Sequence, residues 1–288
     1  MDVALQIGLN AVIAGAIYSL VTLGFNLTYS TARFFDLSYG AVAAAGGYVV
    51  LYLTQTLGQN LYLSILLGVL FAGALSFIIE LTIFRPLRKK KATHTVLLIA
   101  SLGVLSVIQA AIAIFFGSQF HTLVQDLGAI AVFHVGSAAI TQSQTLILVV
   151  AVAIMFALGF ALKYTRFGKA VVAIADDEEV AQIVGINTDH IISSVFFIGG
   201  AIAGIAGIGI GFDSGLLPTL GLAILLKGVI GAIIGGIGNV YGSVLGAFLL
   251  AIVENLGAWQ FSGEWRDAIA FFVLIAFLLF RPRGILPR

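Results

Sequence analysis

Nine stretches of about 20 mostly apolar residues fill most of this 288-residue chain and constrain its fold more than any other feature. A helix of that length spans the hydrocarbon core of a bilayer. Barrel strands would alternate apolar and polar residues, whereas these stretches are apolar throughout. The sequence therefore predicts an all-α membrane protein, a polytopic bundle of eight to nine transmembrane helices. The stretches lie near residues 3–30, 38–57, 61–84, 96–117, 144–162, 191–212, 219–236, 242–261 and 268–281.

The composition excludes a soluble globular protein. Hydrophobic residues make up 60% of the chain and charged residues 9%, where soluble domains carry roughly 25% charged residues. The 34 glycines suit closely packed or broken helices. The glycine-rich pieces 38–47 and 228–246 are candidate half-helices, which leaves the count at eight or nine. A net charge of +1 argues against nucleic acid, and the absence of cysteine excludes disulfides and thiolate metal sites.

Basic residues predict the orientation. The segment "RPLRKKK" (85–91) carries five, three more lie at 163–169, and the tail "FRPRGILPR" carries three. The positive-inside rule places these regions and the C-terminus in the cytoplasm, and the loop 118–144 outside. The N-terminus is then outside if 38–57 spans the membrane, and inside if it is re-entrant. The opening "MDVALQIG" has no basic region or cleavage site, so we expect no removable signal peptide.

One cytoplasmic segment, "AIADDEEVAQIVGINTDH", has a helix pattern of its own. Asp176 is a suitable N-cap, Glu179 stands where a capping box needs it, and Gly185 suits a left-handed stop. These signals predict a short helix at 177–184. Its apolar face is too small to be buried alone, so we expect it to dock on another surface; the alternative is an ordinary connector on the membrane surface. That face consists of Val180, Ala181, Ile183 and Val184.

Catalytic patterns are missing. The four histidines have no ligand spacing, and neither HExxH, GxSxG nor a GxxxxGK[ST] phosphate loop occurs. An intramembrane enzyme would need a nucleophile such as Ser38 beside a histidine, and no histidine lies within a predicted span. We therefore expect no enzyme activity, no metal and no bound cofactor, with any ATP and Mg²⁺ held by another chain.

The ionisable residues within the membrane segments are functional candidates by default. They are Asp36, Glu80, Lys227 and Glu254. Glu80 stands one turn before the basic loop and can turn toward Arg85 or Arg88. Lys227 and Glu254 lie in successive antiparallel segments, where they either pair or each reach a water-filled space.

Asp36 stands in "FFDLSYG", where Asp36-Leu37-Ser38 is a good helix N-cap sequence followed by small residues. A half-helix from here would aim free backbone N–H groups into the membrane, as solute-binding half-helices of transporters do. The alternative is that Asp36 only caps a helix near Arg33.

A second break is predicted at "GGIGNVYGSVLGAF" (235–248), which contains Asn239 and Tyr241. Tyr39-Gly40-Ala41-Val42 and Tyr241-Gly242-Ser243-Val244 stand at an offset of 202, which hints at duplicated halves. Glycine pairs spaced by four are read as helix packing: Gly200 with Gly204, Gly207 with Gly211 and Gly242 with Gly246. The predicted solute pathway consists of Asp36, Ser38, Tyr39, Gly40, Lys227, Asn239, Tyr241 and Glu254.

Several longer stretches carry a family pattern. They are "TRFGKAVVAIADDEEVAQIVGIN", "GLAILLKGVIGAIIGGIG", "GSVLGAFLLAIVEN" and "RPRGILPR", with "GLNAVIAGAIYSLVTLGFNLTYS" and "FRPLRKKK" earlier. Together they resemble the permeases of branched-chain amino acid ABC importers over almost the whole chain. Glu179-Val180-Ala181, with Gly185 six residues after Glu179, resembles the motif by which such permeases contact their ATPases.

The resemblance implies an ABC importer permease fold in one transmembrane domain, 1–288, with a cytoplasmic coupling loop at 163–190. It assigns ATPase coupling to Asp176, Glu179, Val180, Ala181, Ile183 and Gly185. It also implies a second permease subunit, two ATPase subunits, an extracytoplasmic solute-binding protein and a plasma-membrane location. The segment at Asp36 is closer to ribose-type sugar permeases, so urea, short amides and sugar-like solutes are alternatives to amino acids. A secondary transporter, working without an ATPase, is the other alternative.

Overall fold

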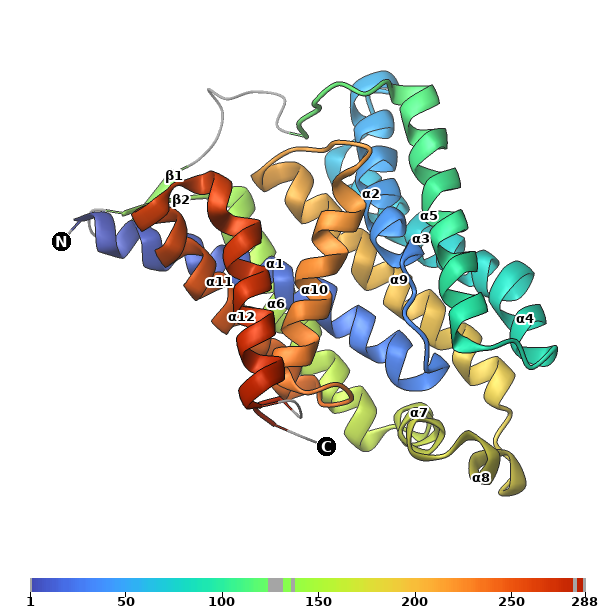
Figure 1. The fold of residues 1–288 in the computed structure, drawn as a ribbon. Coiled ribbons are helices and arrows are strands. Elements are labelled where there is room, and N and C mark those ends of the chain that lie inside the picture. The colour runs from blue at the N-terminus through green and yellow to red at the C-terminus, as the bar shows by residue number, and fades with distance from the viewer. Residues whose placement is uncertain (1, 124–131, 136–137, 282–283, 287–288) are drawn as a thin grey trace.

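Each of the nine predicted segments forms a helix in the computed structural model, which describes residues 2–123, 132–135, 138–281 and 284–286 (Figure 1). The helices are α1 (Asp2–Ala32), α2 (Ser38–Leu51), α3 (Leu61–Ile79), α4 (Arg85–Lys89), α5 (His94–Phe116), α6 (Gln142–Tyr164), α7 (Arg166–Asp176), α8 (Glu178–Ile183), α9 (Thr188–Asp213), α10 (Leu220–Gly235), α11 (Val240–Phe261) and α12 (Arg266–Phe280). Two π-helical segments, Tyr52–Thr56 and Glu80–Phe84, and a 3₁₀ turn, Gly263–Trp265, complete the helical part. A hairpin of β1 (Val132–Val135) and β2 (Ala138–Thr141) pairs antiparallel, with Val132 opposite Thr141.

Six described helices are long and apolar enough to cross a membrane: Val3–Ala32, Leu61–Lys89, His94–Phe116, Gln142–Tyr164, Thr188–Asp213 and Val240–Phe261. The α10 helix is apolar and shorter. The chain is therefore a multi-pass α-helical membrane protein, and the total of eight to nine crossings stays a prediction.

Polar caps begin many of these helices. Side chains of Asn60, Thr93, Thr141, Thr165, Asn187 and Asn239 accept backbone N–H groups of the first turn that follows them. Thr141 and Gln144 form a complete capping box at the start of α6. These residues fix where the helices begin, because the first N–H groups of a helix have no partner within it.

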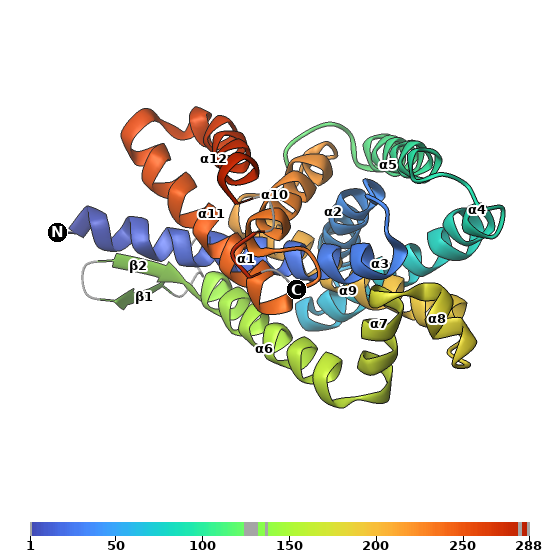
Figure 2. The same ribbon diagram turned by 60° about the horizontal axis from the view of Figure 1, so that its bottom comes forward.

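The α2 helix lies at the centre of the bundle, between α3, α5, α9 and α10 (Figure 2). Nearly all of its residues are buried. Its glycines serve close packing: a side chain on Gly40 would collide with the backbone of Gly221 on α10. The helix runs unbroken through Gly40–Gly47, and the only break beside Asp36 precedes Ser38. The break predicted beside Asp36 is present at residues 33–37, and the small residues of α2 bring neighbouring backbones together.

The predicted glycine pairs also lie at helix contacts. Gly200 and Gly204 of α9 face Ala72 of α3, and Gly207 faces the backbone of Ala43. Gly246 faces Gly231 and Gly235 of α10. Packing by small residues, which lets helices approach closely in lipid, is thus confirmed for these positions.

The basic segments gather at one end of the molecule. The α4, α7 and α8 helices and the end of α12 lie there, while the N-terminus and the β1–β2 hairpin lie at the opposite end (Figure 1). Gln6 of α1 bonds to the backbone of Ala139 in the hairpin, which ties those two parts together. Part of the predicted outer loop 118–144 lies outside the described residues.

The chain after α12 folds back onto the end of α10. The backbone N–H groups of Ile285 and Leu286 donate to the carbonyl oxygens of Ile234 (2.8 Å) and Gly235 (3.1 Å). Gly284, at φ +78°, allows this approach because it lies against the backbone of Gly236. These bonds satisfy carbonyls that the last turn of a helix leaves open.

Candidate functional site

Asp36 is a buried cap at the start of α2. Its side chain is 4% exposed, and its Oδ1 atom accepts the backbone N–H of Ser38 at 2.9 Å and the Ser38 hydroxyl. The N-cap position itself is Leu37, so Asp36 lies one residue before it and bonds to the first helical residue, Ser38. Tyr39 is also buried and its ring packs edge-on against Phe25.

Arg33, just before Asp36, turns toward another element. Its guanidinium donates to the backbone oxygens of Ala175 and Asp176 at the end of α7. Arg33 has φ +60°, a left-handed conformation that lets the chain leave α1 sharply. The loop between α1 and α2 is thereby attached to the segment that the sequence predicts to lie in the cytoplasm and to contact the ATPase.

Lys227 and Glu254 form an ion pair inside the bundle. Lys227 Nζ lies 3.2 Å from Glu254 Oε2 and 3.4 Å from Asp267 Oδ1 at the start of α12. The Tyr18 hydroxyl of α1 donates to Glu254 Oε2 at 2.7 Å and accepts from Lys227 at 3.0 Å. Glu254 is 1% exposed, whereas Asp267 is 71% exposed. Of the two readings that the sequence left open, pairing is confirmed, and the pair connects to the surface through Asp267.

Asn239 and Tyr241 begin α11 and have different surroundings. Asn239 caps the helix by accepting the N–H of Gly242 at 3.0 Å. Tyr241 is 58% exposed and its hydroxyl lies near Gly159 of α6. The predicted pathway residues thus occupy three places: the start of α2, the pair at Lys227 and Glu254, and the start of α11.

Asn26 of α1 is a polar residue that the sequence reasoning missed. It is 3% exposed, and its Oδ1 atom accepts the N–H of Gly238 at 2.6 Å. Its amide donates to the backbone oxygen of Asn239 at 3.3 Å and to the Ser243 hydroxyl. The available signal was an amide side chain within an apolar spanning segment. Lipid offers it no hydrogen bonds, so its partners must lie within the protein. Asn26 joins α1 to the break between α10 and α11.

The coupling segment differs from its prediction by one residue. Asp177, and not Asp176, is the N-cap of α8: its Oδ1 atom accepts the N–H groups of Glu179 (2.9 Å) and Val180 (3.1 Å). The predicted capping box with Glu179 at the third helical position is therefore wrong. The reason is α7, which the sequence analysis missed and which continues through Asp176, so the extended residue that starts the next helix is Asp177.

The end of α8 agrees with the sequence. Gly185 has φ +89°, and the N–H groups of Gly185 and Ile186 return to Gln182 and Ala181 at 3.0 Å each. This is the left-handed stop that glycine permits. Ala181 faces inward at 2% exposure, whereas Ile183 is 83% and Val184 69% exposed. The α8 helix therefore presents an uncovered apolar surface at the end of the molecule that carries the basic segments.

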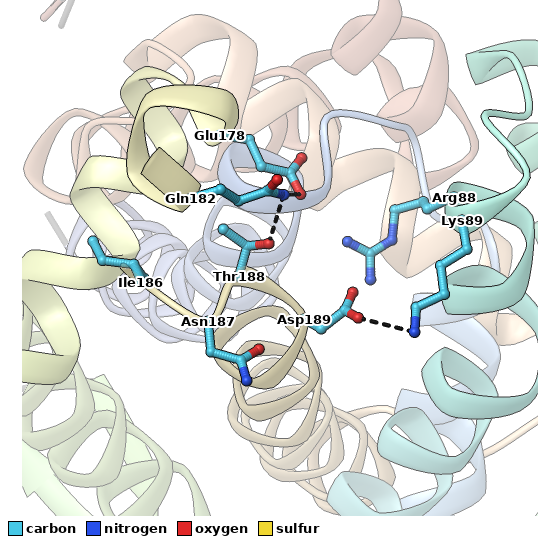
Figure 3. Close-up of a pocket in the computed structure, with 8 residues that line it drawn as sticks. All are labelled: Arg88, Lys89, Glu178, Gln182, Ile186, Asn187, Thr188 and Asp189. Atoms are coloured by element: carbon cyan, nitrogen blue, oxygen red, sulfur yellow. Dashed lines mark hydrogen bonds and ion pairs between the residues drawn. The ribbon is translucent and has the colours of Figure 1, made fainter. Parts of the chain in front are cut away.

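A hollow of about 400 Å³ separates α8 from α4 (Figure 3). Gln182 of α8 donates to the Thr188 hydroxyl at 3.0 Å. Across the hollow, Asp189 Oδ2 lies 3.0 Å from Arg85 and 3.2 Å from Lys89. Arg88 pairs with the buried Glu80, as the sequence suggested. The residues that line the hollow are Arg88, Lys89, Glu178, Gln182, Ile186, Asn187, Thr188 and Asp189.

Comparison with known proteins decides the family. Residues 7–278 match the family described as "Branched-chain amino acid transport system / permease component". The chain belongs to this family. It is 32% identical to the high-affinity branched-chain amino acid transport system permease proteins LivH of Escherichia coli K12 and BraD of Pseudomonas aeruginosa, in each case over 99% of this chain and 96% of the relative. A probable LivH of Methanocaldococcus jannaschii is 28% identical over 96% of this chain and 90% of that protein.

A solved structure supports the fold. The structure of PsaBC from Streptococcus pneumoniae in complex with Fab matches with a TM-score of 0.55 at 14% identity, over 95% of this chain and 91% of that chain. The family is thus shown by sequence, and the solved structure shares the fold. The chain is a membrane transport permease and not itself an enzyme.

Proposed function

We propose that this chain is the membrane-spanning permease subunit of an ABC importer for branched-chain amino acids. It works with a second permease subunit, two cytoplasmic ATPase subunits and an extracytoplasmic binding protein, and the ATPases hold ATP and Mg²⁺. Its relatives in Escherichia coli and Pseudomonas aeruginosa are named as permeases of branched-chain amino acid transport, and 96% of each aligns with this chain. Residues 1–288 then act as one transmembrane domain with the coupling loop 163–190.

The uncovered surface of α8 is the observation that supports a partner ATPase as the energy source. Val180 is 54% exposed, beside the still more exposed Ile183 and Val184, on a helix capped at Asp177 and stopped at Gly185. Exposed apolar side chains on a short rigid helix are typical of a protein contact. An ATPase that closes on ATP would push this helix and shift the bundle between outward and inward openings. The same coupling role is proposed for Asp176, Glu179 and Ala181.

For the solute pathway we propose the polar residues already predicted: Asp36, Ser38, Tyr39, Gly40, Lys227, Asn239, Tyr241 and Glu254. Charged side chains inside a membrane protein usually mark the path of a solute or ion. Lys227 and Glu254 together offer both signs of charge, which suits a zwitterion. The plasma membrane is the proposed location, with the C-terminus in the cytoplasm.

The decisive experiment reconstitutes the chain with its partner permease, ATPases and binding protein in liposomes. We expect ATP-dependent uptake of leucine, isoleucine or valine, and cross-linking of an Ile183→Cys variant to the ATPase. Tyr62→Cys, which is exposed and lies outside the coupling loop, is the control for cross-linking. Uptake of urea or ribose in place of amino acids would support the alternative solutes. Uptake by the permease chains alone would support a secondary transporter and contradict the proposal.

A further inference from the structure

The start of α9 is held by two cations of the basic segment. Asp189 is the second residue of α9 and follows the chain that leaves α8. Its Oδ2 atom lies 3.0 Å from Arg85 and 3.2 Å from Lys89, and its side chain is 31% exposed. Two cations on one half-buried carboxylate form a network, which holds its geometry better than an isolated surface pair.

The same basic segment is fixed to the interior through Glu80. This carboxylate is 0% exposed and pairs with Arg88, which is 15% exposed. Glu80 begins the π-helical turn Glu80–Phe84, so the arginine reaches back along the helix across that turn. A buried charge that loses its partner is strongly destabilising, so this pair resists separation.

Aromatic packing fixes the π-helical turn on its other side. Phe84 is 0% exposed, and its ring centroid lies 4.9 Å from that of Phe34 and 5.7 Å from that of Phe196 on α9. Single π turns inside a helix occur frequently at functional sites. The end of α3 is therefore attached to α9 twice, through packed rings within the bundle and through charges at its surface.

An ordinary positive-inside anchor would leave these cations to lipid headgroups. Here Arg85, Arg88 and Lys89 pair with protein carboxylates, whereas the ion pairs of the described residues include neither Lys90 nor Lys91. The close-up shows Asp189 and Lys89 directed at each other beside the hollow, with Glu178 and Gln182 of α8 at its other edge (Figure 3). The structure thus assigns different tasks to the cations of one segment.

We infer that Glu80, Arg85, Arg88, Lys89 and Asp189 form a brace that passes displacement of α8 into α3 as well as α9. The inference rests on the proposed function, since it assumes that an ATPase pushes α8. Without the brace, α8 moves α9 alone and α3 follows only through packing. The brace residues are positioning residues, and none of them is assigned to the solute or to ATP.

The test uses the complete importer in liposomes and measures solute taken up per ATP hydrolysed. Asp189→Asn removes the charge that both cations share and keeps the side-chain size. We expect loaded binding protein to stimulate ATP hydrolysis by the variant importer as in the wild type. Uptake per ATP should fall about threefold or more, which is the size of effect that mutations between coupled sites produce. Asp189→Glu should restore most of the ratio. Lys90→Gln, on the same segment and outside the brace, should leave it unchanged.

A merely structural role predicts another pattern: ATPase activity and uptake fall together, or less complex assembles, and the ratio stays at the wild-type value. That result, or a normal ratio in Asp189→Asn, overturns the brace. The variant Arg85→Gln/Lys89→Gln tests the same contacts with α9 intact and should reproduce the loss of coupling. Failure of the proposed function is seen separately, because the wild-type importer would then take up no branched-chain amino acid.

Discussion

At the scale of single residues, two buried polar side chains, Asn26 and Glu254, bond to other helices. Asn26 serves the turn between α10 and α11, and Glu254 accepts from Tyr18 and Lys227. Lipid offers no hydrogen bonds, so such groups must be satisfied within the protein. These contacts fix how α1 lies against α10 and α11.

The charge pair can be tested by removing one or both charges. Lys227→Met alone leaves Glu254 buried without its cation, which costs about 3–5 kcal/mol and should lower the thermal unfolding temperature in detergent. In Lys227→Met/Glu254→Gln no buried charge of the pair remains, and Asp267, which also loses Lys227, is 71% exposed, so stability should return. Because we place the pair on the solute pathway, uptake by the reconstituted importer should stay well below wild type. A double variant with normal uptake would reduce the pair to a structural contact.

At the scale of elements, the coupling segment shows which local signals are reliable. The stop at Gly185 follows from local chemistry, since a left-handed residue is needed there and glycine adopts it without strain. The start of α8 differs from the prediction by one residue because α7 extends to Asp176. The signal for α7 was present in the sequence. Thr165 caps α7 by accepting the N–H of Gly168 at 2.9 Å, and its buried residues at helical spacing are Val171, Ile174 and Ala175.

Glycine is needed at position 185 because of the positive φ angle there, and not because a larger side chain would collide with a neighbour. A Cβ atom at this position meets nothing within 4 Å, but φ is +89°. Gly185→Ala should therefore destabilise the end of α8 by about 1 kcal/mol, giving roughly fivefold faster hydrogen exchange of the α8 amides. Gly185→Asn should have a smaller effect, since asparagine tolerates this conformation better. Gly103→Ala is the control, because that helical glycine also has open space around it. Equal exchange in Gly185→Ala and wild type would contradict this account.

The candidate site was predictable by residue type and not by arrangement. Apolar length predicted nine helical segments but not the short helices α4, α7 and α8, and the rarity of charge in and beside those segments singled out Asp36, Lys227 and Glu254. Which helices meet depends on how glycine and alanine faces fit together, as where Gly40 meets Gly221, and no local pattern contains that information. The β1–β2 hairpin was missed for a similar reason, because its strands are short and their pairing is tertiary.

At the scale of the whole molecule, three helices long and apolar enough to span a membrane lie between Tyr62 and Ile183: α3, α5 and α6. From this odd number of candidate crossings we predict that Tyr62 and Ile183 lie on opposite sides of the membrane. Tyr62 is 72% exposed and Ile183 83% exposed, so cysteines at either position would be accessible to reagents.

This arrangement can be tested without background labelling, because the chain has no cysteine. With the permease expressed without its ATPase, a membrane-impermeant maleimide should label Tyr62→Cys in right-side-out vesicles and Ile183→Cys only in inside-out vesicles. Lys91→Cys should behave like Ile183→Cys and serves as the control for the cytoplasmic side. Labelling of Tyr62→Cys and Ile183→Cys from the same side would show that one of the three helices does not cross.

The backbone bonds from Ile285 and Leu286 to the end of α10 have a practical consequence. A force that displaces Ile285 and Leu286 also loosens the turn between α10 and α11, which Asn26 holds. An affinity tag fused directly to this end is therefore a poor choice for purification, whereas a tag separated by a flexible spacer leaves these backbone hydrogen bonds intact.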